Sequence, residues 1–252
     1  MLVPDLKKIT KPIWSHKLGY GVNQQGWFKL NNPGQATAPE DPKLLQKLGV
    51  KKGEKVLFIA GYYADWASFL VKKGVKVDYN DVSEQMIDYV KKNIKIKFNK
   101  YIHSNYELIP KKEKEYDWTI TFEACGGSQG LPIAYLRSLL NNKGGILILF
   151  YQRGGHMGSK WKRYPSIVKK LAKIYNTTFS IKEMKIVGRK KGGPRSSLLH
   201  RVYIIRTNNQ ARELVKKDLS ELTSNKFSKD SLIRLSKVAK LIKKEFLKEV
   251  AA

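Results

Sequence analysis

The chain has 252 residues, 42% of them hydrophobic, and its 49 Lys and Arg against 21 Asp and Glu give a formal net charge of +28 at pH 7. This length and hydrophobic content predict one main domain with a sizeable core and appendages. The single cysteine excludes an internal disulfide framework, and no apolar run approaches the length of a membrane span, so we expect a protein of the reducing cytoplasm without a membrane partner.

Residues 1–42 form an N-terminal extension, of which residues 14–42 are rich in Gly, Asn, Gln and aromatic side chains and have almost no periodicity. Loops of that length in compact proteins tend to be lids or binding loops. This segment is therefore a candidate lid, in which Trp14 and Tyr20 are residues to test for contact with a substrate. The alternative is an extended strap that fills a surface groove.

The most informative segment is 55–86, which predicts a strand, a turn, a helix and a second strand. Val56–Ile59 is a short apolar run before Gly61, a helical pattern follows as far as Lys72, and Val75–Tyr79 reads as the next strand. This βαβ unit places its first turn at the carboxyl edge of a parallel sheet, where such sheets bind ligands.

Asp81 lies twenty positions after Gly61. A carboxylate there can accept hydrogen bonds from both ribose hydroxyls of a nucleoside. The alternative is an ordinary doubly wound domain whose acidic residue caps a helix.

After the second strand, Asp81, Val82, Ser83 and Met86 form the pattern DxSxxM. With the preceding strand, turn and helix, this segment resembles the class I S-adenosylmethionine-dependent methyltransferases, and the resemblance covers roughly residues 44–206. The first half of the usual pattern, an acid followed by GxGxG, differs here. Phe58 stands at the acidic position, and Ala60, Tyr62 and Ala64 stand at the glycine positions, with Gly61 between them.

The resemblance implies a Rossmann-like α/β fold: a mostly parallel, seven-stranded sheet with helices on both faces and an antiparallel closing hairpin. The third parallel strand of the sheet would lie in 102–110, the fourth in 116–122 and the fifth at the end of 139–150. The closing hairpin would comprise 181–187 and 201–206. The domain would span residues 43–207, followed by basic helices in 208–252 that pack on it.

The resemblance also implies S-adenosyl-L-methionine as the cofactor. Asp81 would bind ribose, Gly61 with Ala60 and Ala64 would form the cofactor turn, and Asn105 would contact adenine. The full set of implied cofactor-binding residues is Ala60, Gly61, Tyr62, Ala64, Asp81, Val82, Asn105 and Glu123. No catalytic residue is assigned, because methyl transfer depends mainly on positioning and on excluding water. The four histidines lie far apart, with no ligand spacing to one another or to the cysteine, so a metal site has little support.

The positive charge is uneven: residues 151–252 carry 26 basic against 7 acidic side chains, a net charge of +19. Such a density favours a nucleic-acid partner, since each neutralised phosphate releases counterions. A lysine-rich proteome is the alternative, but it usually raises glutamate in parallel. Aromatic side chains beside the cations favour RNA over DNA, because they can stack on unpaired bases. The expected contact residues are Arg153, Lys160, Trp161 and Arg163 in one cluster, and Arg189, Lys190, Lys191 and Arg195 at a hairpin tip.

The C-terminal segment 230–249 has apolar residues at helical spacing with lysines between them. The pattern predicts an amphipathic helix packed on the domain; binding to an RNA backbone or to an anionic membrane is the alternative. Taken together, the sequence predicts a methyltransferase that acts on RNA or on a ribonucleoprotein. A non-enzymatic nucleic-acid or ribosome-binding protein with a decayed methyltransferase fold is the main alternative, and methylation of a small molecule conflicts with the charge.

Overall fold

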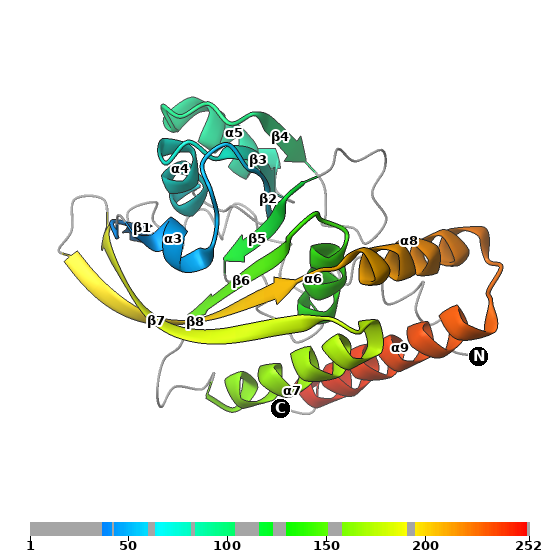
Figure 1. Cartoon of the computed structure of the whole chain (residues 1–252). Helices are drawn as coiled ribbons and strands as arrows, with labels where there is room; N and C mark the ends of the chain where they lie inside the picture. The colour runs from blue at the N-terminus through cyan, green and yellow to red at the C-terminus, as the bar shows by residue number, and fades with distance from the viewer. Residues whose placement is uncertain are drawn as a thin grey trace.

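A computed structural model describes residues 37–41, 43–59, 64–81, 84–103, 116–122, 130–150, 158–190 and 195–250. Its centre is one mixed sheet with the strand order β1-β7-β8-β6-β5-β2-β3-β4 (Figure 1). The parallel strands are β2 (Lys55–Ile59), β3 (Lys76–Asp81), β4 (Lys100–His103), β5 (Trp118–Phe122) and β6 (Gly144–Phe150). The antiparallel hairpin of β7 (Thr178–Lys190) and β8 (Arg195–Arg206) closes the sheet beside β6.

This arrangement confirms the predicted fold class, a mostly parallel Rossmann-like sheet with an antiparallel closing hairpin. The sheet has one strand more than the seven predicted, because β1 (Thr37–Pro39) pairs antiparallel with β7. This strand comes from the end of the segment that the sequence assigns to the N-terminal extension. It covers part of the outer edge of β7, whose backbone groups would otherwise lie unpaired there. The third parallel strand begins earlier than predicted and ends at His103.

Helices cover both faces of the sheet (Figure 1). On one face lie α3 (Leu44–Leu48), α4 (Asp65–Lys72) and α5 (Glu84–Asn93), and on the other lie α6 (Gly130–Leu139), α7 (Gly158–Tyr175), α8 (Asn209–Ser224) and α9 (Lys229–Val250). Strand β6 shows why the strands read as apolar runs: Ile146 and Ile148 pack with the first group of helices, whereas Leu147 packs with the second. No helix in the described ranges is long and apolar enough to cross a membrane.

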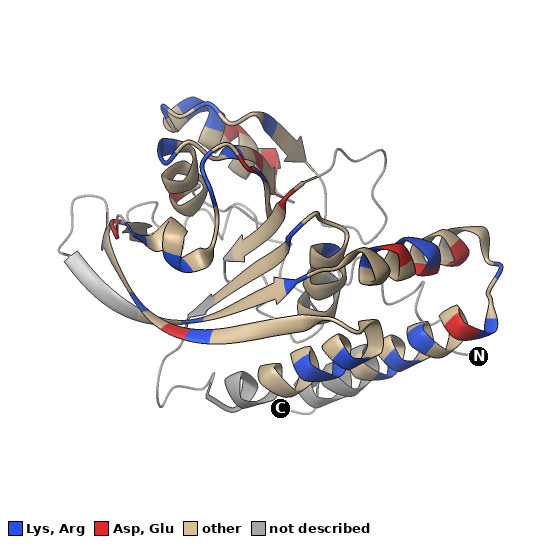
Figure 2. Cartoon of the chain, viewed as in Figure 1, with Lys and Arg blue, Asp and Glu red and all other residues tan. Residues whose placement is uncertain are grey.

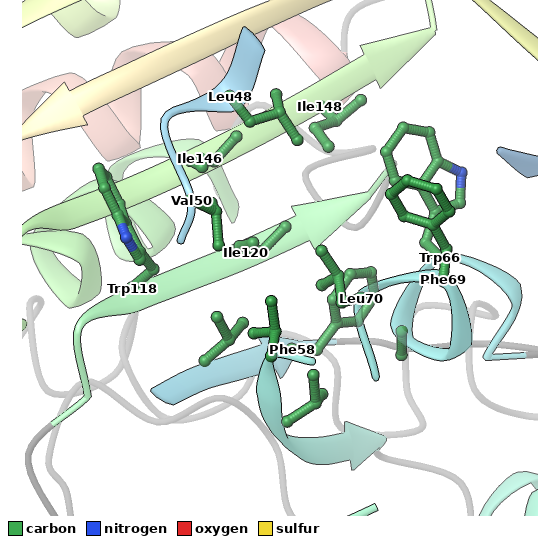
Figure 3. Packing of buried hydrophobic residues seen from close by; sticks show 14 of the residues in the cluster. Leu48, Val50, Phe58, Trp66, Phe69, Leu70, Trp118, Ile120, Ile146 and Ile148 are labelled. Atoms are coloured by element: carbon green, nitrogen blue, oxygen red, sulfur yellow. The ribbon is translucent and has the colours of Figure 1, made fainter. Parts of the chain in front are cut away.

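The core beneath α3 and α4 joins segments that are distant in sequence (Figure 3). Leu48 is the last residue of α3 and Val50 lies two positions beyond it, and Trp66 and Leu70 lie one helical turn apart on α4. These side chains belong to one buried cluster with residues of β2, β5 and β6, such as Phe58. The strand that precedes the candidate site and the helix that follows it are therefore held by the same apolar contacts.

Glu54 connects three strands where β2 begins. Its carboxylate accepts a hydrogen bond of 2.7 Å from the Trp118 indole on β5, pairs with the Lys143 ammonium group before β6, and accepts the backbone N–H of Lys51 at 2.9 Å. Burial raises the pKa of the Glu54 carboxyl, but these three donors outweigh burial and hold the pKa below its ordinary value of 4.5. The ionised form therefore stabilises the fold.

We predict that Glu54→Gln lowers the free energy of unfolding by about 2 kcal/mol at neutral pH, since a charge-assisted hydrogen bond contributes about 1.5–3 kcal/mol. Because the folded-state pKa is depressed, this difference from the wild type is complete above about pH 5 and shrinks as the pH falls through the folded-state value. Urea unfolding at a series of pH values measures it. Glu213→Gln is the control, because Glu213 pairs with Lys216 on an exposed surface and should cost less than about 1 kcal/mol at any pH. A pH-independent difference for Glu54→Gln contradicts this account.

Asp218 on α8 connects this helix to both α9 and α7. Its side chain is 1% exposed, and it accepts hydrogen bonds from Arg234 Nε at 3.0 Å on α9 and from the Tyr175 hydroxyl at 3.2 Å on α7. A second contact from Arg234 Nη2 makes the ion pair bidentate. The helices α7, α8 and α9 thus share one buried charged contact in addition to their apolar packing.

Arg234→Met should lower the free energy of unfolding by about 3–5 kcal/mol, because it leaves the buried Asp218 carboxylate without its cation. Lys216→Met on α8 removes an exposed ion pair instead and should cost less than about 1 kcal/mol. Chemical denaturation of the two variants measures the difference. Equal losses in the free energy of unfolding would contradict this account, because the buried Asp218–Arg234 pair would then stabilise the fold no more than the exposed Glu213–Lys216 pair does.

Candidate functional site

The candidate site lies at the carboxyl edge of the sheet, where β2 and β3 end beside each other. Phe58 and Tyr79 are partners in this parallel pair, and Asp81 is the last residue of β3. Asp81 is also the partner of His103, the last residue of β4. The register therefore brings the ends of three neighbouring strands to one place. The Asp81 side chain is largely buried, with 7% of its surface exposed.

A second carboxylate, that of Asp65, lies at the same edge. Burial is the main cause that raises the pKa of the Tyr79 hydroxyl, and the negative charges of Asp81 and Asp65 both add to it. Tyr79 therefore stays neutral, and both carboxylates lie close enough to act on it. Asp65 is the first residue of α4, a position where the helix dipole favours an acid. Sequence reasoning did not select Asp65, because an acid in a first turn is common in helices.

The other polar residues of β3 lie on the opposite face of the strand. Asp78 accepts a hydrogen bond of 2.7 Å from the Tyr116 hydroxyl and another from the Asn99 amide. The Asn80 amide donates to the Ile102 carbonyl of β4 at 3.0 Å. These contacts join neighbouring strands. Because side chains alternate along a strand, Asp81 shares its face with Tyr79 and lies at the edge.

The turn between β2 and α4 ends at Ala64, whose backbone is left-handed with φ 60° and ψ 13°. Its carbonyl accepts the N–H of Ser68 at 2.7 Å and so begins the helix. The side chain is fully buried. A left-handed conformation costs a residue with a Cβ atom about 1–2 kcal/mol and costs glycine almost nothing. Ala64 occupies the third glycine position of the GxGxG pattern, and its backbone has a conformation typical of glycine although alanine is present.

The structure describes two of the residues predicted to bind the cofactor, Ala64 and Asp81, and both lie at this edge. The other six lie outside the described residues: Ala60, Gly61, Tyr62, Val82, Asn105 and Glu123. Of the predicted substrate-binding residues, Trp14, Tyr20, Arg153 and Lys191 also lie outside them.

The remaining substrate-binding candidates fall in described elements, and only their backbones are described. Lys160, Trp161 and Arg163 belong to the first turns of α7. Arg189 and Arg195 are partners in the last rung of the β7–β8 ladder, and β1 lies beside them with Lys190 as the partner of Thr37. The basic residues of this hairpin end are thus brought together beside β1.

The arrangement at the carboxyl edge suits a ligand with a vicinal diol and a positive charge. A carboxylate at the end of the second parallel strand can accept two hydrogen bonds from a ribose. The second carboxylate adds negative charge, which attracts a cation. No group of three or more His, Cys, Asp or Glu side chains able to hold a metal ion is found in the described part of the chain.

No protein-family model matches the sequence, and no curated protein matches it either. Several solved structures are similar in fold. A SAM-dependent methyltransferase from Aquifex aeolicus is 16% identical, with 81% of this chain and 98% of that chain covered and a TM-score of 0.46. The magnesium protoporphyrin IX methyltransferase from Synechocystis, solved with bound SAM, is 15% identical (65% and 76% covered, TM-score 0.43), and Trm5b from Pyrococcus abyssi is 18% identical (68% and 51% covered, TM-score 0.42). At these identities and TM-scores, function has to be argued from the site itself.

We predict that Ala64→Gly changes the free energy of unfolding by less than about 0.5 kcal/mol, because relief of the left-handed strain offsets the loss of about 0.8 kcal/mol from one buried methyl group. The matched control is Ala67→Gly, which removes an equally buried methyl group from the interior of α4. The control should lose about 2 kcal/mol, since glycine there also lowers helix propensity. Urea denaturation compares the two variants, and equal losses would mean that the Ala64 backbone is not strained.

Proposed function

We propose that this protein is an S-adenosylmethionine-dependent methyltransferase that acts on RNA or on a ribonucleoprotein. The observation that carries the proposal is the position of Asp81 as the last residue of β3, beside the end of β2. In open α/β sheets, a ligand binds outside the carboxyl ends of the strands, and an acid after the second strand binds the ribose. Asp65 at the start of α4 supports the proposal, because a second negative charge favours a cationic cofactor over an anionic one.

The residues of this edge fit the cofactor as follows. Asp81 would accept hydrogen bonds from both ribose hydroxyls, the turn that contains Ala60, Gly61 and Ala64 would lie against the methionine part, and Asn105 would contact adenine. When bound, S-adenosylmethionine supplies an electrophilic methyl group on a sulfonium centre. The chain would contribute by orienting the acceptor towards that group and by excluding water, which accounts for much of the rate in such a transfer.

The charge of the chain supports RNA as the substrate class. A net charge of +28 favours a polyanion, and a small uncharged substrate would gain nothing from it. The predicted contact residues around Arg163 and Arg195 combine cations with an aromatic ring, Trp161, that could stack on an unpaired base. These contacts would place an RNA acceptor near the carboxyl edge.

A specific observation favours a second candidate function. Phe58, at the position where the resemblance has an acid, is fully buried and belongs to the apolar core between the sheet and α4. The second-to-last residue of β2 therefore offers no carboxylate to a cofactor. A non-enzymatic RNA-binding or ribosome-binding protein with a decayed pocket would show the same feature.

Titration with S-adenosylmethionine tests the proposal. We expect the wild-type protein to bind it in a calorimeter, and Asp81→Ala to bind it at least about tenfold more weakly, since the loss of a hydrogen bond to a charged group costs about 1.5–3 kcal/mol. Asp88→Ala is the control, because Asp88 is an exposed carboxylate on α5. Circular dichroism of both variants verifies that the fold is intact.

The outcomes separate the two candidate functions. An Asp81→Ala variant that keeps the wild-type affinity refutes the assignment of the ribose contact. A wild-type protein that binds no S-adenosylmethionine but binds RNA supports the non-enzymatic function instead. Transfer of a labelled methyl group to co-purified RNA would identify the substrate class directly.

A further inference from the structure

Eleven exposed lysines gather around the edge of the sheet opposite the candidate site, and we call this surface the lysine edge (Figure 2). It comprises Lys51, Lys52, Lys55, Lys72, Lys73, Lys76, Lys91, Lys92, Lys95, Lys97 and Lys100. In the sequence these residues are spread over fifty positions and do not form a run. They also lie outside the C-terminal segment that holds most of the net charge, so composition did not reveal them.

The topology brings these lysines together. In a parallel sheet, the strands begin where the preceding helices end, so the starts of β2, β3 and β4 lie at the same edge as the ends of α4 and α5. Lys55 and Lys76 are partners in the β2–β3 ladder. Hydrogen bonds connect the adjoining segments: Gly53 N–H donates to the Gly74 carbonyl at 2.9 Å, and Asn99 N–H donates to the carbonyl of Val77 in β3 at 2.9 Å. The lysine edge is therefore a contiguous surface on strand starts, helix ends and loops that hydrogen bonds connect.

Three carboxylates at this edge of the sheet are already engaged. Glu54 binds Lys143 and Trp118, and Asp117 accepts the backbone N–H of Lys55 at 2.8 Å. Asp78 is buried beneath Tyr116. In the described ranges, none of the eleven ammonium groups forms an ion pair. Asp88, one helical turn before Lys91 and Lys92, is an exposed carboxylate, and a single negative charge leaves most of the positive charge of the lysine edge without compensation.

Helix stability accounts for only part of this cluster. Lys72 and Lys73 end α4, and Lys91 and Lys92 lie in the last turn of α5, where the helix dipole favours cations. The other seven lysines lie in loops or at strand starts, where no helix dipole favours them. Mutual repulsion among so many like charges destabilises the folded chain. An external anion would relieve this repulsion.

The chemistry of the lysine edge suits phosphate groups rather than bases or lipid tails. Its aromatic residues are covered: Phe69 and Phe98 are buried, and the ammonium groups of Lys73 and Lys91 lie over the rings of Phe69 and Tyr101, at 5.7 and 5.5 Å from their centroids. Stacking on unpaired bases requires an exposed ring, and insertion into a membrane requires an exposed apolar face. Lysine is a point charge that binds phosphate without reading sequence.

We propose that the lysine edge binds the phosphodiester backbone of a structured RNA, independently of base sequence, and holds it while another part of the same molecule reaches the carboxyl edge. The choice of RNA rests on the proposed function. The strands that separate the two edges are five and six residues long, so the edges are about 15 Å apart at a rise of about 3.3 Å per residue. A mononucleotide cannot touch both edges, whereas a folded RNA can.

The test compares two fourfold variants with the same change in charge. Lys55, Lys76, Lys95 and Lys97 are changed to Gln in the first, and in the control Lys226, Lys229, Lys237 and Lys240 are changed to Gln. All eight side chains are exposed, and in the described ranges none forms an ion pair. A labelled RNA duplex is titrated with the wild type and with each variant at several salt concentrations.

The lysine-edge variant should bind the duplex at least about tenfold more weakly than the wild type near physiological salt, and its slope of log K against log salt should be smaller by about 2–3, since each phosphate contact contributes about 0.9. The control should change affinity by less than about threefold. Equal losses in both variants overturn the proposal, because affinity would then follow net charge alone. Unchanged binding by the lysine-edge variant overturns it as well.

Two further measurements separate the alternatives. Vesicles that contain phosphatidylserine are titrated in parallel: loss of vesicle binding with unchanged RNA binding would assign the surface to a membrane and overturn the proposal. Calorimetric titration with S-adenosylmethionine should give the same affinity for the lysine-edge variant as for the wild type. If the wild type binds no cofactor while the lysine-edge variant still loses RNA binding, the proposed methyltransferase function fails and the inference about this surface stands.

Discussion

The parallel direction of the central strands is the constraint on which the rest of this structure depends. Because neighbouring strands run the same way, a turn that follows a strand lies at the carboxyl edge of the sheet, and a turn that precedes a strand lies at the opposite edge. In this protein the carboxyl edge carries the Asp81 and Asp65 carboxylates, and the opposite edge carries the eleven lysines of the lysine edge. The separation of negative and positive groups therefore follows from chain direction.

Buried polar contacts fix the positions of the strand starts at the edge of the sheet where the lysine edge lies. Glu54 joins the loop before β2 to β5 and β6, and the Asn141 amide donates to Thr119 Oγ1 at 2.8 Å and to the Gly144 carbonyl at 2.7 Å. Gly144 has φ 131°, and a Cβ atom there would lie 2.0 Å from the Ile205 carbonyl oxygen, so only glycine fits. Buried polar groups with satisfied hydrogen bonds specify one arrangement of neighbouring strands. The exposed lysines thus project from a well-determined framework.

The two edges together suggest a division of roles in the proposed function. A cationic cofactor would be attracted to the Asp81 and Asp65 carboxylates, and the backbone of a polyanion would be attracted to the lysine edge. Because the two edges are about 15 Å apart, the lysine edge would bind the RNA at a site remote from the reacting atom. Binding energy from remote contacts of this kind can be used to orient an acceptor.

The sequence by itself determined the order and type of the central elements. The apolar run at Val56–Ile59, the helical pattern up to Lys72 and the Gly-Gly start of the fifth parallel strand predict β2, α4 and β6 closely, because strands buried on both faces and amphipathic helices have distinct periods. It also placed Asp81 at the end of the second strand. These features depend on local spacing, which a single sequence contains.

Only the tertiary structure decided which distant residues meet. The pairing of β1 with β7, the position of Asp65 near Tyr79 and the left-handed backbone of Ala64 have no local signal that distinguishes them from common alternatives. The lysine edge is the clearest case, since its members lie at the ends of different elements and become neighbours only when parallel strands align their starts. Long-range strand pairing sets these contacts, and hydrophobic periodicity along the chain does not encode them.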